Sequence, residues 1–262
     1  MTFHSSSLAP AAGSRIVIAG GAGGLGRAFT SACLDLDLVP IVLDLESSLT
    51  QLSDIDVREQ VAFDARDEGS IGEAVRNIAG RFEAIEGFVF LSGFPILPRA
   101  PLTETRSDRW DELMAVNLRS AYLLTQGLLP LLLKAENPAI VTVASSLAYQ
   151  VMPGMAAYAT SKGGLVSLTK AIAMENGPSL RANSVAPGAV ETAFLGGGIG
   201  REAQSNDRSW FDSMKQNYEA SIPLRRVAEP ADVVGPILFL LSQASAYMTG
   251  QVLHLNGGRL TP

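Results

Sequence analysis

The chain has 262 residues, of which 47% are hydrophobic and 18% charged, and its formal net charge is -6. This length and composition suit one globular α/β domain with a substantial core. The acidic balance, without clustered Lys and Arg, argues against nucleic acid as a partner. The longest apolar stretch, residues 121–133, is too short and too interrupted to span a bilayer, so we expect no membrane association.

Residues 1–14 lack the basic flank and apolar core of a signal peptide, and their Ser, Ala and Pro content predicts a disordered tail. The single cysteine, Cys33, lies among apolar residues with helical spacing and cannot form an internal disulfide. Both features favour a cytoplasmic protein. We expect residues 15–262 to form one domain.

The chain then alternates between apolar runs and helical patterns. Residues 15–19 predict a strand that passes through a glycine-rich loop into a helix over residues 25–36. Gly20, Gly24 and Gly26 lack side chains, which lets the backbone approach a pyrophosphate at the positive end of this helix. A tight turn with a glycine packing seam is the alternative interpretation.

A second apolar run, residues 38–43, ends at Asp44, where dinucleotide-binding folds place a carboxylate against the adenosine ribose. Asp44 favours NAD over NADP because it would repel a 2′-phosphate, although a simple turn residue is the alternative. A third run, residues 61–63, leads to Asp64, a candidate for contact with the adenine edge.

The middle of the chain predicts a helix over residues 69–82 and a buried strand over residues 87–91, followed by a turn at Gly93. Residues 107–133 predict one long helix or two joined helices. Asn117 lies inside this region among apolar residues, where an unpaired amide would be costly. We therefore expect Asn117 to have a buried polar role.

The chemical centre is expected around Ser145, which follows the buried strand predicted over residues 140–143. A helix over residues 155–175 would place Tyr158 and Lys162 one turn apart on one face. A phenol has a pKa near ~10 in water, so it needs a neighbouring cation to act as a base at neutral pH. An ordinary half-exposed helix pair is the alternative for these two residues alone.

Residues 181–185 predict the next strand, residues 230–241 a helix and residues 251–255 a last strand. Residues 194–223 form the longest irregular region, and their aromatic residues suggest a substrate lid with an apolar inner side. A plain surface excursion is the alternative. The repeated alternation of strand and helix predicts a three-layer α/β fold with a parallel sheet between helices.

These motifs, from AGGAGGLG through Ser145 and Tyr-x-x-x-Lys to PGAVET, closely resemble the classical short-chain dehydrogenase/reductase family over residues 15–258. The resemblance implies a seven-stranded Rossmann sheet, a homotetramer and hydride transfer at a nicotinamide ring. It also implies a catalytic tetrad of Asn117, Ser145, Tyr158 and Lys162. The residue-level argument and the resemblance together give the cofactor-binding set Gly20, Gly24, Leu25, Gly26, Asp44, Asp64, Gly93, Tyr158, Lys162, Pro187, Gly188, Val190 and Thr192.

Three departures from the family pattern are visible. Ala19 replaces the usual Thr before the first glycine, and residues 90–93 replace the common Asn-Asn-Ala-Gly, with Gly93 retained. Asn256 stands where the family often has Asp. These changes concern the support of the cofactor loop and the carboxyl end more than the expected chemistry.

The expected activity is the NAD(H)-dependent interconversion of a secondary alcohol and a ketone. Ser145 would hold the substrate oxygen and Tyr158, as a phenolate, would take its proton. Lys162 would lower the pKa of Tyr158 and bind the nicotinamide ribose, while Asn117 would hold a water molecule. No metal is expected, because His4 and His254 are isolated from other ligand types.

The expected partner is a small-molecule substrate, and the pocket candidates form a largely apolar set that favours a hydrophobic cyclic or aromatic substrate. Arg99 is expected at the solvated surface, with a substrate carboxylate as its alternative partner. Two other functions remain open: an NADPH-dependent 3-oxoacyl thioester reductase and a non-catalytic dinucleotide-binding scaffold. The pocket candidates are Phe94, Leu147, Gln150, Met155 and Phe194.

Overall fold

The computed structural model describes residues 8–261 except residues 96, 98 and 197–208. Its centre is a seven-stranded parallel sheet with the strand order β3-β2-β1-β4-β5-β6-β7. This architecture confirms the expected single-domain Rossmann fold. The strands are β1 (Arg15–Ala19), β2 (Val39–Asp44), β3 (Glu59–Ala62), β4 (Gly87–Phe90), β5 (Ala139–Val143), β6 (Arg181–Pro187) and β7 (Val252–Leu255).

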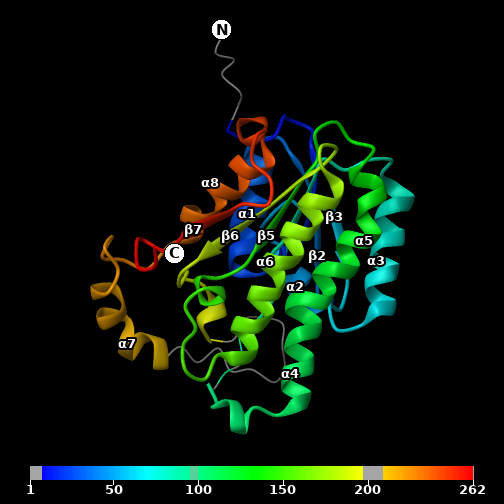
Figure 1. Cartoon of the computed structure of the whole chain (residues 1–262). Helices are drawn as coiled ribbons and strands as arrows, with labels where there is room; N and C mark the ends of the chain where they lie inside the picture. The colour runs from blue at the N-terminus through cyan, green and yellow to red at the C-terminus, as the bar shows by residue number, and fades with distance from the viewer. Residues whose placement is uncertain (1–7, 96, 98, 197–208, 262) are drawn as a thin grey trace, which may run out of the picture.

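Helices cover both faces of the sheet and make the three layers visible in Figure 1. On one face α1 packs against α8, and on the other α3 packs against α5, with α6 beside them. The helices are α1 (Gly24–Asp35), α2 (Glu46–Leu49), α3 (Glu68–Arg81), α4 (Ser107–Met114), α5 (Ser120–Leu132), α6 (Ala156–Asn176), α7 (Ser209–Ala220) and α8 (Pro230–Leu241).

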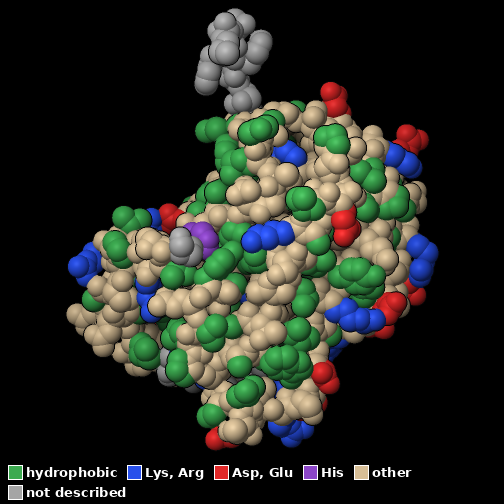
Figure 2. Space-filling model, viewed as in Figure 1, with side chains coloured by type: hydrophobic (Ala, Val, Ile, Leu, Met, Phe, Trp, Pro, Cys, Tyr) green, Lys and Arg blue, Asp and Glu red, His purple; other side chains and the backbone are tan. Residues whose placement is uncertain are grey.

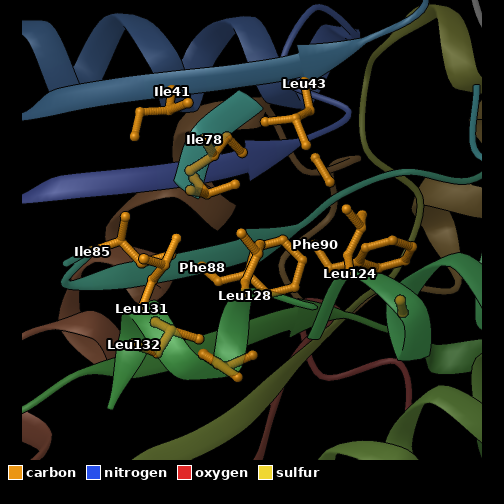
Figure 3. Close-up of a cluster of buried hydrophobic side chains, with 14 of the residues drawn as sticks. Ile41, Leu43, Ile78, Ile85, Phe88, Phe90, Leu124, Leu128, Leu131 and Leu132 are labelled. Carbon is orange, nitrogen blue, oxygen red and sulfur yellow. The ribbon is translucent and has the colours of Figure 1, made fainter. Parts of the chain in front are cut away.

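The core lies in two buried layers, one on each face of the sheet. Successive residues of β1 supply both, with Ile16 and Ile18 on the α1/α8 side and Val17 and Ala19 on the α3/α5 side. This two-sided burial explains why the strands read as continuous apolar runs. Figure 3 shows the layer on the α3/α5 side, where Phe88 and Phe90 of β4 face the leucines of α5.

The expected long helix over residues 107–133 contains one widened turn. The segment Ala115–Arg119 between α4 and α5 is π-helical, and Asn117 lies fully buried inside it. A π turn adds a residue to the helical repeat and is frequent at functional sites. The backbone thus continues through the turn while it directs Asn117 inward.

The irregular region expected over residues 194–223 proves partly helical. Ser209–Ala220 forms α7, in which the rings of Phe211 and Tyr218 make an edge contact with centroids 6.0 Å apart. Phe211, Met214 and Tyr218 recur at helical spacing, so the sequence carried this signal. Residues 197–208 of the expected lid lie outside the described residues.

Part of the expected amino-terminal tail is described. The N–H of Gly13 donates to the carbonyl of Asp37 at 2.7 Å, and Ser14 accepts from the N–H of Val39 at 2.9 Å. The remainder of the tail, residues 1–7, lies outside the described residues. In the part of the chain that the structure covers, every helix is too short or too polar to cross a membrane.

The packing of α5 predicts that truncating a buried leucine within the helix lowers stability far more than truncating the exposed leucine that follows its last residue. Leu128 is 0% exposed and Leu133 is 45% exposed. Leu128→Ala should lower the free energy of unfolding by about 2–5 kcal/mol, because it removes buried contacts and leaves a cavity. Leu133→Ala should change it by less than about 0.5 kcal/mol. Equal losses in urea denaturation would contradict this packing.

Candidate active site

A cavity of about 1000 Å³ lies at the carboxyl ends of the strands. The strand order reverses between β1 and β4, because β2 and β3 lie on one side and β5 to β7 on the other. Parallel α/β sheets bind their ligands at such a point. The cavity is lined by every residue of the predicted cofactor-binding set: Gly20, Gly24, Leu25, Gly26, Asp44, Asp64, Gly93, Tyr158, Lys162, Pro187, Gly188, Val190 and Thr192.

The glycine-rich loop between β1 and α1 requires its missing side chains. A Cβ on Gly26 would lie 2.1 Å from the carbonyl oxygen of Gly20, and one on Gly24 would lie 2.8 Å from the Cβ of Thr192. Gly20 also has a φ of +84°, which disfavours other residues. The loop therefore forms the close packing seam that was the alternative interpretation of these glycines. It also presents the amino end of α1 to the cavity.

Asp44 is fixed where β2 ends. Its carboxylate accepts the N–H of Ala22 at 2.9 Å and the N–H of Leu45 at 2.8 Å. Burial raises the pKa of Asp44, although these hydrogen bonds act in the opposite direction. The carboxylate thus holds the glycine loop and also lines the cavity. A simple turn residue, the alternative interpretation of Asp44, would not account for both contacts.

Asp64 lies beyond β3 and is held by a cation that the sequence reasoning missed. The guanidinium of Arg66 donates to both carboxylate oxygens of Asp64, and this pairing raises the pKa of Arg66. Arg66 lines the same cavity and lies 3.9 Å from a carboxylate oxygen of Glu112. No periodic pattern in the sequence marks Arg66, because its position follows from its pairing with Asp64 in the short loop after β3.

Ser145, Tyr158 and Lys162 converge on one wall of the cavity. The hydroxyl of Ser145 accepts the N–H of Leu147 at 3.1 Å, and it lowers the pKa of the neighbouring Tyr158 phenol. The ammonium of Lys162 donates to the carbonyl of Val143 at 2.8 Å and lies 5.9 Å from the centre of the Tyr158 ring. The pair is deeply buried, since Tyr158 is 6% and Lys162 3% exposed.

Burial governs the electrostatics of this group. It raises the pKa of Tyr158 to about 12, although the Ser145 hydroxyl acts in the opposite direction, and it lowers the pKa of Lys162 to about 8. Both shifts have the same cause, because burial disfavours the charged form of each group. The expected lowering of the Tyr158 pKa by the charge of Lys162 stays a prediction.

Asn117 supports the site from behind. Its Oδ1 accepts the N–H of Phe94 at 3.0 Å, and its Nδ2 donates to the carbonyl of Phe94 at 3.1 Å and to the hydroxyl of Ser161 at 3.2 Å. A Cβ on Gly93 would lie 3.1 Å from that Oδ1 and 3.4 Å from the Nζ of Lys162. Asn117 is thus buried as expected, but it is outside the cavity lining and holds the loop after β4.

The segment after β6 forms the opposite wall. The phenol of Tyr218 on α7 accepts the N–H of Ala189 at 3.3 Å, and Lys215 on α7 forms an ion pair with Glu191 at 3.1 Å. Thr192 lies against the glycine loop through its contact with Gly24. These contacts hold α7 over the end of the sheet, where it supplies part of the cavity wall.

Four of the five predicted pocket residues line the cavity: Phe94, Leu147, Met155 and Phe194. The ring of Phe194 lies 6.1 Å from that of Tyr158. Gln150 is exposed and outside the lining, because the turn after β5 directs it to solvent. Arg99, expected at the surface, lines the cavity and has a buried Nε. Its place depends on packing between loops, which no local pattern indicates.

Among the described residues, no group of three or more His, Cys, Asp and Glu side chains is placed to hold a metal ion. The ring of His254 makes an edge contact with Tyr149, with centroids 4.6 Å apart. Asn256, one of the departures from the family pattern, accepts the N–H groups of Gly258 and Leu260 and so forms the turn that follows β7.

Comparison with known proteins agrees with this geometry. The model of a family described as enoyl-(acyl carrier protein) reductase matches residues 20–259. A 3-oxoacyl-[acyl-carrier-protein] reductase FabG of Thermotoga maritima is 30% identical over 249 residues, covering 92% of this chain and 96% of the relative. A 2-(S)-hydroxypropyl-CoM dehydrogenase 3 of Xanthobacter autotrophicus is 28% identical over 250 residues, covering 93% of this chain and 95% of the relative.

Among solved structures, a short-chain glucose/ribitol dehydrogenase from Brucella melitensis aligns with a TM-score of 0.85 and 25% identity, covering 97% of this chain and 99% of the other. The ligand-free aldohexose dehydrogenase of Thermoplasma acidophilum, with a TM-score of 0.83 and 23% identity over 96% of this chain and 98% of the other, shares the fold. The chain therefore belongs to the short-chain dehydrogenase/reductase family, oxidoreductases that bind a nicotinamide dinucleotide and act on small-molecule substrates.

Proposed function

We propose that this protein is an NAD(H)-dependent oxidoreductase that interconverts a secondary alcohol and a ketone. One observation carries the proposal: Ser145, Tyr158 and Lys162 converge on the wall of a cavity whose other end is formed by the glycine loop and Asp44. The apolar side chains around Tyr158 favour a hydrophobic cyclic or aromatic substrate.

The residues present fit a dinucleotide cofactor. The close contacts at Gly24 and Gly26 leave a cradle that side chains would fill, and the amino end of α1 offers N–H groups to a pyrophosphate. Asp44 would accept the hydroxyls of the adenosine ribose and disfavour a 2′-phosphate. In the proposed site, Asp64 contacts the adenine edge, and the segment of Pro187 to Thr192 borders the nicotinamide.

The proposed reaction uses an acid-base pair of this chain. The cofactor supplies a hydride acceptor for alcohol oxidation and a hydride donor for ketone reduction. In oxidation, Ser145 holds the substrate oxygen by a hydrogen bond, and the Tyr158 phenolate takes the hydroxyl proton as the carbon loses its hydride. In reduction, the phenol of Tyr158 returns that proton to the oxygen.

Lys162 and Asn117 act on this pair in different ways. The positive charge of Lys162 favours the phenolate of Tyr158 once both are enclosed, because opposite charges interact strongly in a site that excludes water. In the proposal Lys162 also binds the nicotinamide ribose. Asn117 is a positioning residue that fixes the backbone of Phe94 beside Gly93. That Asn117 holds a water molecule remains a prediction.

A second candidate is a reductase of 3-oxoacyl thioesters that uses NADPH. The name of the Thermotoga maritima relative favours this substrate class. Arg66 in the cavity lining is a base that could meet a 2′-phosphate, but its guanidinium is paired with Asp64. Asp44 favours NAD instead, and a non-catalytic scaffold is disfavoured by the convergence of Ser145, Tyr158 and Lys162.

The proposal also covers the substrate lid, the cellular compartment and the assembly of the enzyme. Residues 194–223 serve as the substrate lid, supported by the contacts of α7 with the segment after β6. A reducing cytoplasm fits the single cysteine, Cys33, whose burial raises its pKa to about 12 and makes it unreactive. The proposed assembly is a homotetramer.

The role of Asp44 predicts cofactor preference. In titrations followed by fluorescence, the wild type should bind NAD(H) at least about tenfold more tightly than NADP(H), and Asp44→Ala should lose most of this preference. Asp56→Ala, which removes an exposed carboxylate outside the cavity lining, is the matched control and should leave it unchanged. A preference for NADP(H) would favour the thioester reductase, and no binding of either would favour the scaffold.

The role of Tyr158 predicts a pH dependence with opposite signs in the two directions. Since burial raises the pKa of Tyr158 to about 12, kcat/KM for oxidation of 4-methylcyclohexanol or 1-phenylethanol should rise with pH through the neutral and alkaline range. Reduction needs the protonated phenol and should fall only at high pH.

Two matched Tyr→Phe substitutions test the acid-base role of Tyr158. Tyr158→Phe should lower kcat about 10²- to 10⁴-fold, whereas Tyr122→Phe on the exposed side of α5 should have little effect. Full activity of Tyr158→Phe would exclude the proposed acid-base role.

The exposed hydrophobic side chains of α5 and α6 predict subunit contacts. Tyr122 on α5 and Met174 on α6 are exposed, and hydrophobic groups reach the surface over these helices in Figure 2. Burying them in an interface is favourable. Light scattering should give a mass four times that of the 27.6 kDa chain. A monomer at micromolar concentration would contradict the proposed tetramer.

A further inference from the structure

The helix α7 is held by contacts outside the main core. It lies at the side of the molecule where β6 and β7 lie, apart from the helices that cover the sheet (Figure 1). None of its described residues belongs to the buried clusters of the core, yet Phe211, Met214 and Tyr218 line the cavity. A helix of this length owes most of its stability to tertiary packing, so the position of α7 depends on the segments that contact it.

One of these segments is the turn of residues 256–260, which follows β7. Asn256 is 8% exposed, and its Oδ1 accepts the N–H groups of Gly258 and Leu260 at 3.0 and 3.3 Å. Its Nδ2 donates to the carbonyl of Leu260 at 3.0 Å. An ionised aspartate at this position could accept the two N–H groups but could not donate to the carbonyl. Asn256 therefore fixes both sides of the turn that carries Arg259.

This turn packs against residues 221–224, which directly follow α7. The N–H of Leu224 donates to the carbonyl of Gly257 at 3.2 Å, and a Cβ on Gly257 would lie 2.5 Å from the Cγ2 of Ile222. Gly257 also has a φ of +64°, which favours glycine. The backbone of the turn thus lies in close contact with the chain at the carboxyl end of α7.

Arg259 extends from the turn to α7 itself. Its guanidinium carbon lies 4.6 Å from the centre of the Tyr218 ring, and its Nε donates to the hydroxyl of Ser221 at 3.0 Å. The face of an aromatic ring attracts a guanidinium, and the dipole of a helix favours a cation at its carboxyl end. Tyr218 lies in the last turn of α7, so both attractions act on the end of this helix.

Tyr218 continues this contact into the cavity. Its phenol oxygen accepts the N–H of Ala189 at 3.3 Å, and its ring makes an edge contact with Phe211. Phe211 and Ala189 both line the cavity, and Ala189 belongs to the segment that is proposed to border the nicotinamide. The side chain of Tyr218 therefore joins three parts of the site: the turn after β7, the inner face of α7 and the segment after β6.

We propose that Arg259 is a positioning residue that holds α7 against the cavity, so that the turn after β7 determines how tightly the enzyme retains its substrate. The inference deepens the proposed function and rests on it, because α7 belongs to the proposed substrate lid. Ser145, Tyr158 and Lys162 are carried by the end of β5 and by α6. Loosening α7 therefore weakens retention of the substrate and leaves the acid-base group in place.

Hydrogen exchange of the full chain without ligand measures the hold on α7 directly. Arg259→Met should speed amide exchange in residues 209–220 about 5- to 30-fold and leave α6 unchanged, because a cation–π contact and a hydrogen bond are lost. Arg259→Lys keeps a cation that can lie over the ring and should show a smaller effect. Arg58→Met, which removes an exposed arginine outside the cavity lining, is the matched control. Unchanged exchange in Arg259→Met would overturn the inference.

Steady-state reduction of acetophenone with NADH tests the consequence for the reaction. Arg259→Met should raise the KM for acetophenone about 5- to 30-fold without lowering kcat, because retention is weakened while the acid-base group is intact. Arg259→Lys should restore part of the wild-type KM. A lowered kcat at an unchanged KM would contradict a positioning role.

A double substitution separates this role from direct contact between Arg259 and the substrate. Tyr218→Leu removes the ring and the phenol, so Arg259→Met should add little to the KM and to the exchange rate in that background. Tyr218→Phe keeps the ring, and there Arg259→Met should retain most of its effect. An equal effect on KM in all three backgrounds would mean that Arg259 contacts the substrate itself and would overturn the inference. If Arg259→Met does not fold, as judged by its melting curve, Arg259→Lys and Tyr218→Leu decide the question.

The two measurements also distinguish this inference from the proposed function. Faster exchange of α7 in Arg259→Met, together with failure of the wild type to bind either cofactor or to reduce acetophenone, would contradict the proposed function and leave the hold of Arg259 on α7 intact. Turnover of acetophenone by the wild type, with exchange and KM unchanged in Arg259→Met, would contradict the inference and leave the function intact.

Discussion

A buried ammonium group at the end of β5 is the constraint on which the site depends. Taking a lysine charge out of water is costly unless polar groups receive it, and Lys162 meets this cost through the carbonyl of Val143 at 2.8 Å. That bond needs α6 to lie in register with the sheet. Three buried hydroxyls fix the register: Thr142 of β5 bonds to Thr169 of α6 at 2.8 Å and to Ser184 of β6 at 2.7 Å.

The other parts of the site follow from this docking. With α6 in place, Tyr158 lies beside Lys162 and meets the hydroxyl of Ser145 where β5 ends. The opposing pKa shifts of Tyr158 and Lys162 have the same origin, since burial disfavours the charged form of each. In the proposed mechanism, a ligand that encloses the pair would strengthen the attraction between ammonium and phenolate, and the buried phenol would thereby become a usable base.

The sequence predicted the elements that have the strongest hydrophobic patterns. Residues 15–19 and 230–241 match β1 and α8, because continuous apolar runs and a regular helical period have few other solutions. It could also be predicted that the expected cofactor-binding residues line one cavity, from the glycines and acidic residues at strand ends and from the family resemblance. Their binding of a cofactor stays a prediction. By contrast, no local pattern marks the π turn, in which Asn117 bonds to Phe94, or the pairing of Arg66 with Asp64. The position of Arg99 depends on its packing against the segment of Gly154. The helical spacing of Phe211 and Tyr218 was present but lay within a polar, glycine-rich region.

The structure of the complex with NADH tests the central claim most directly, that one cavity positions a dinucleotide between the carboxylate of β2 and the acid-base pair of α6. The account predicts the adenosine ribose at Asp44 and the nicotinamide ring beside Tyr158, with its ribose on Lys162. A cofactor bound in the reverse direction, or outside this cavity, would contradict it.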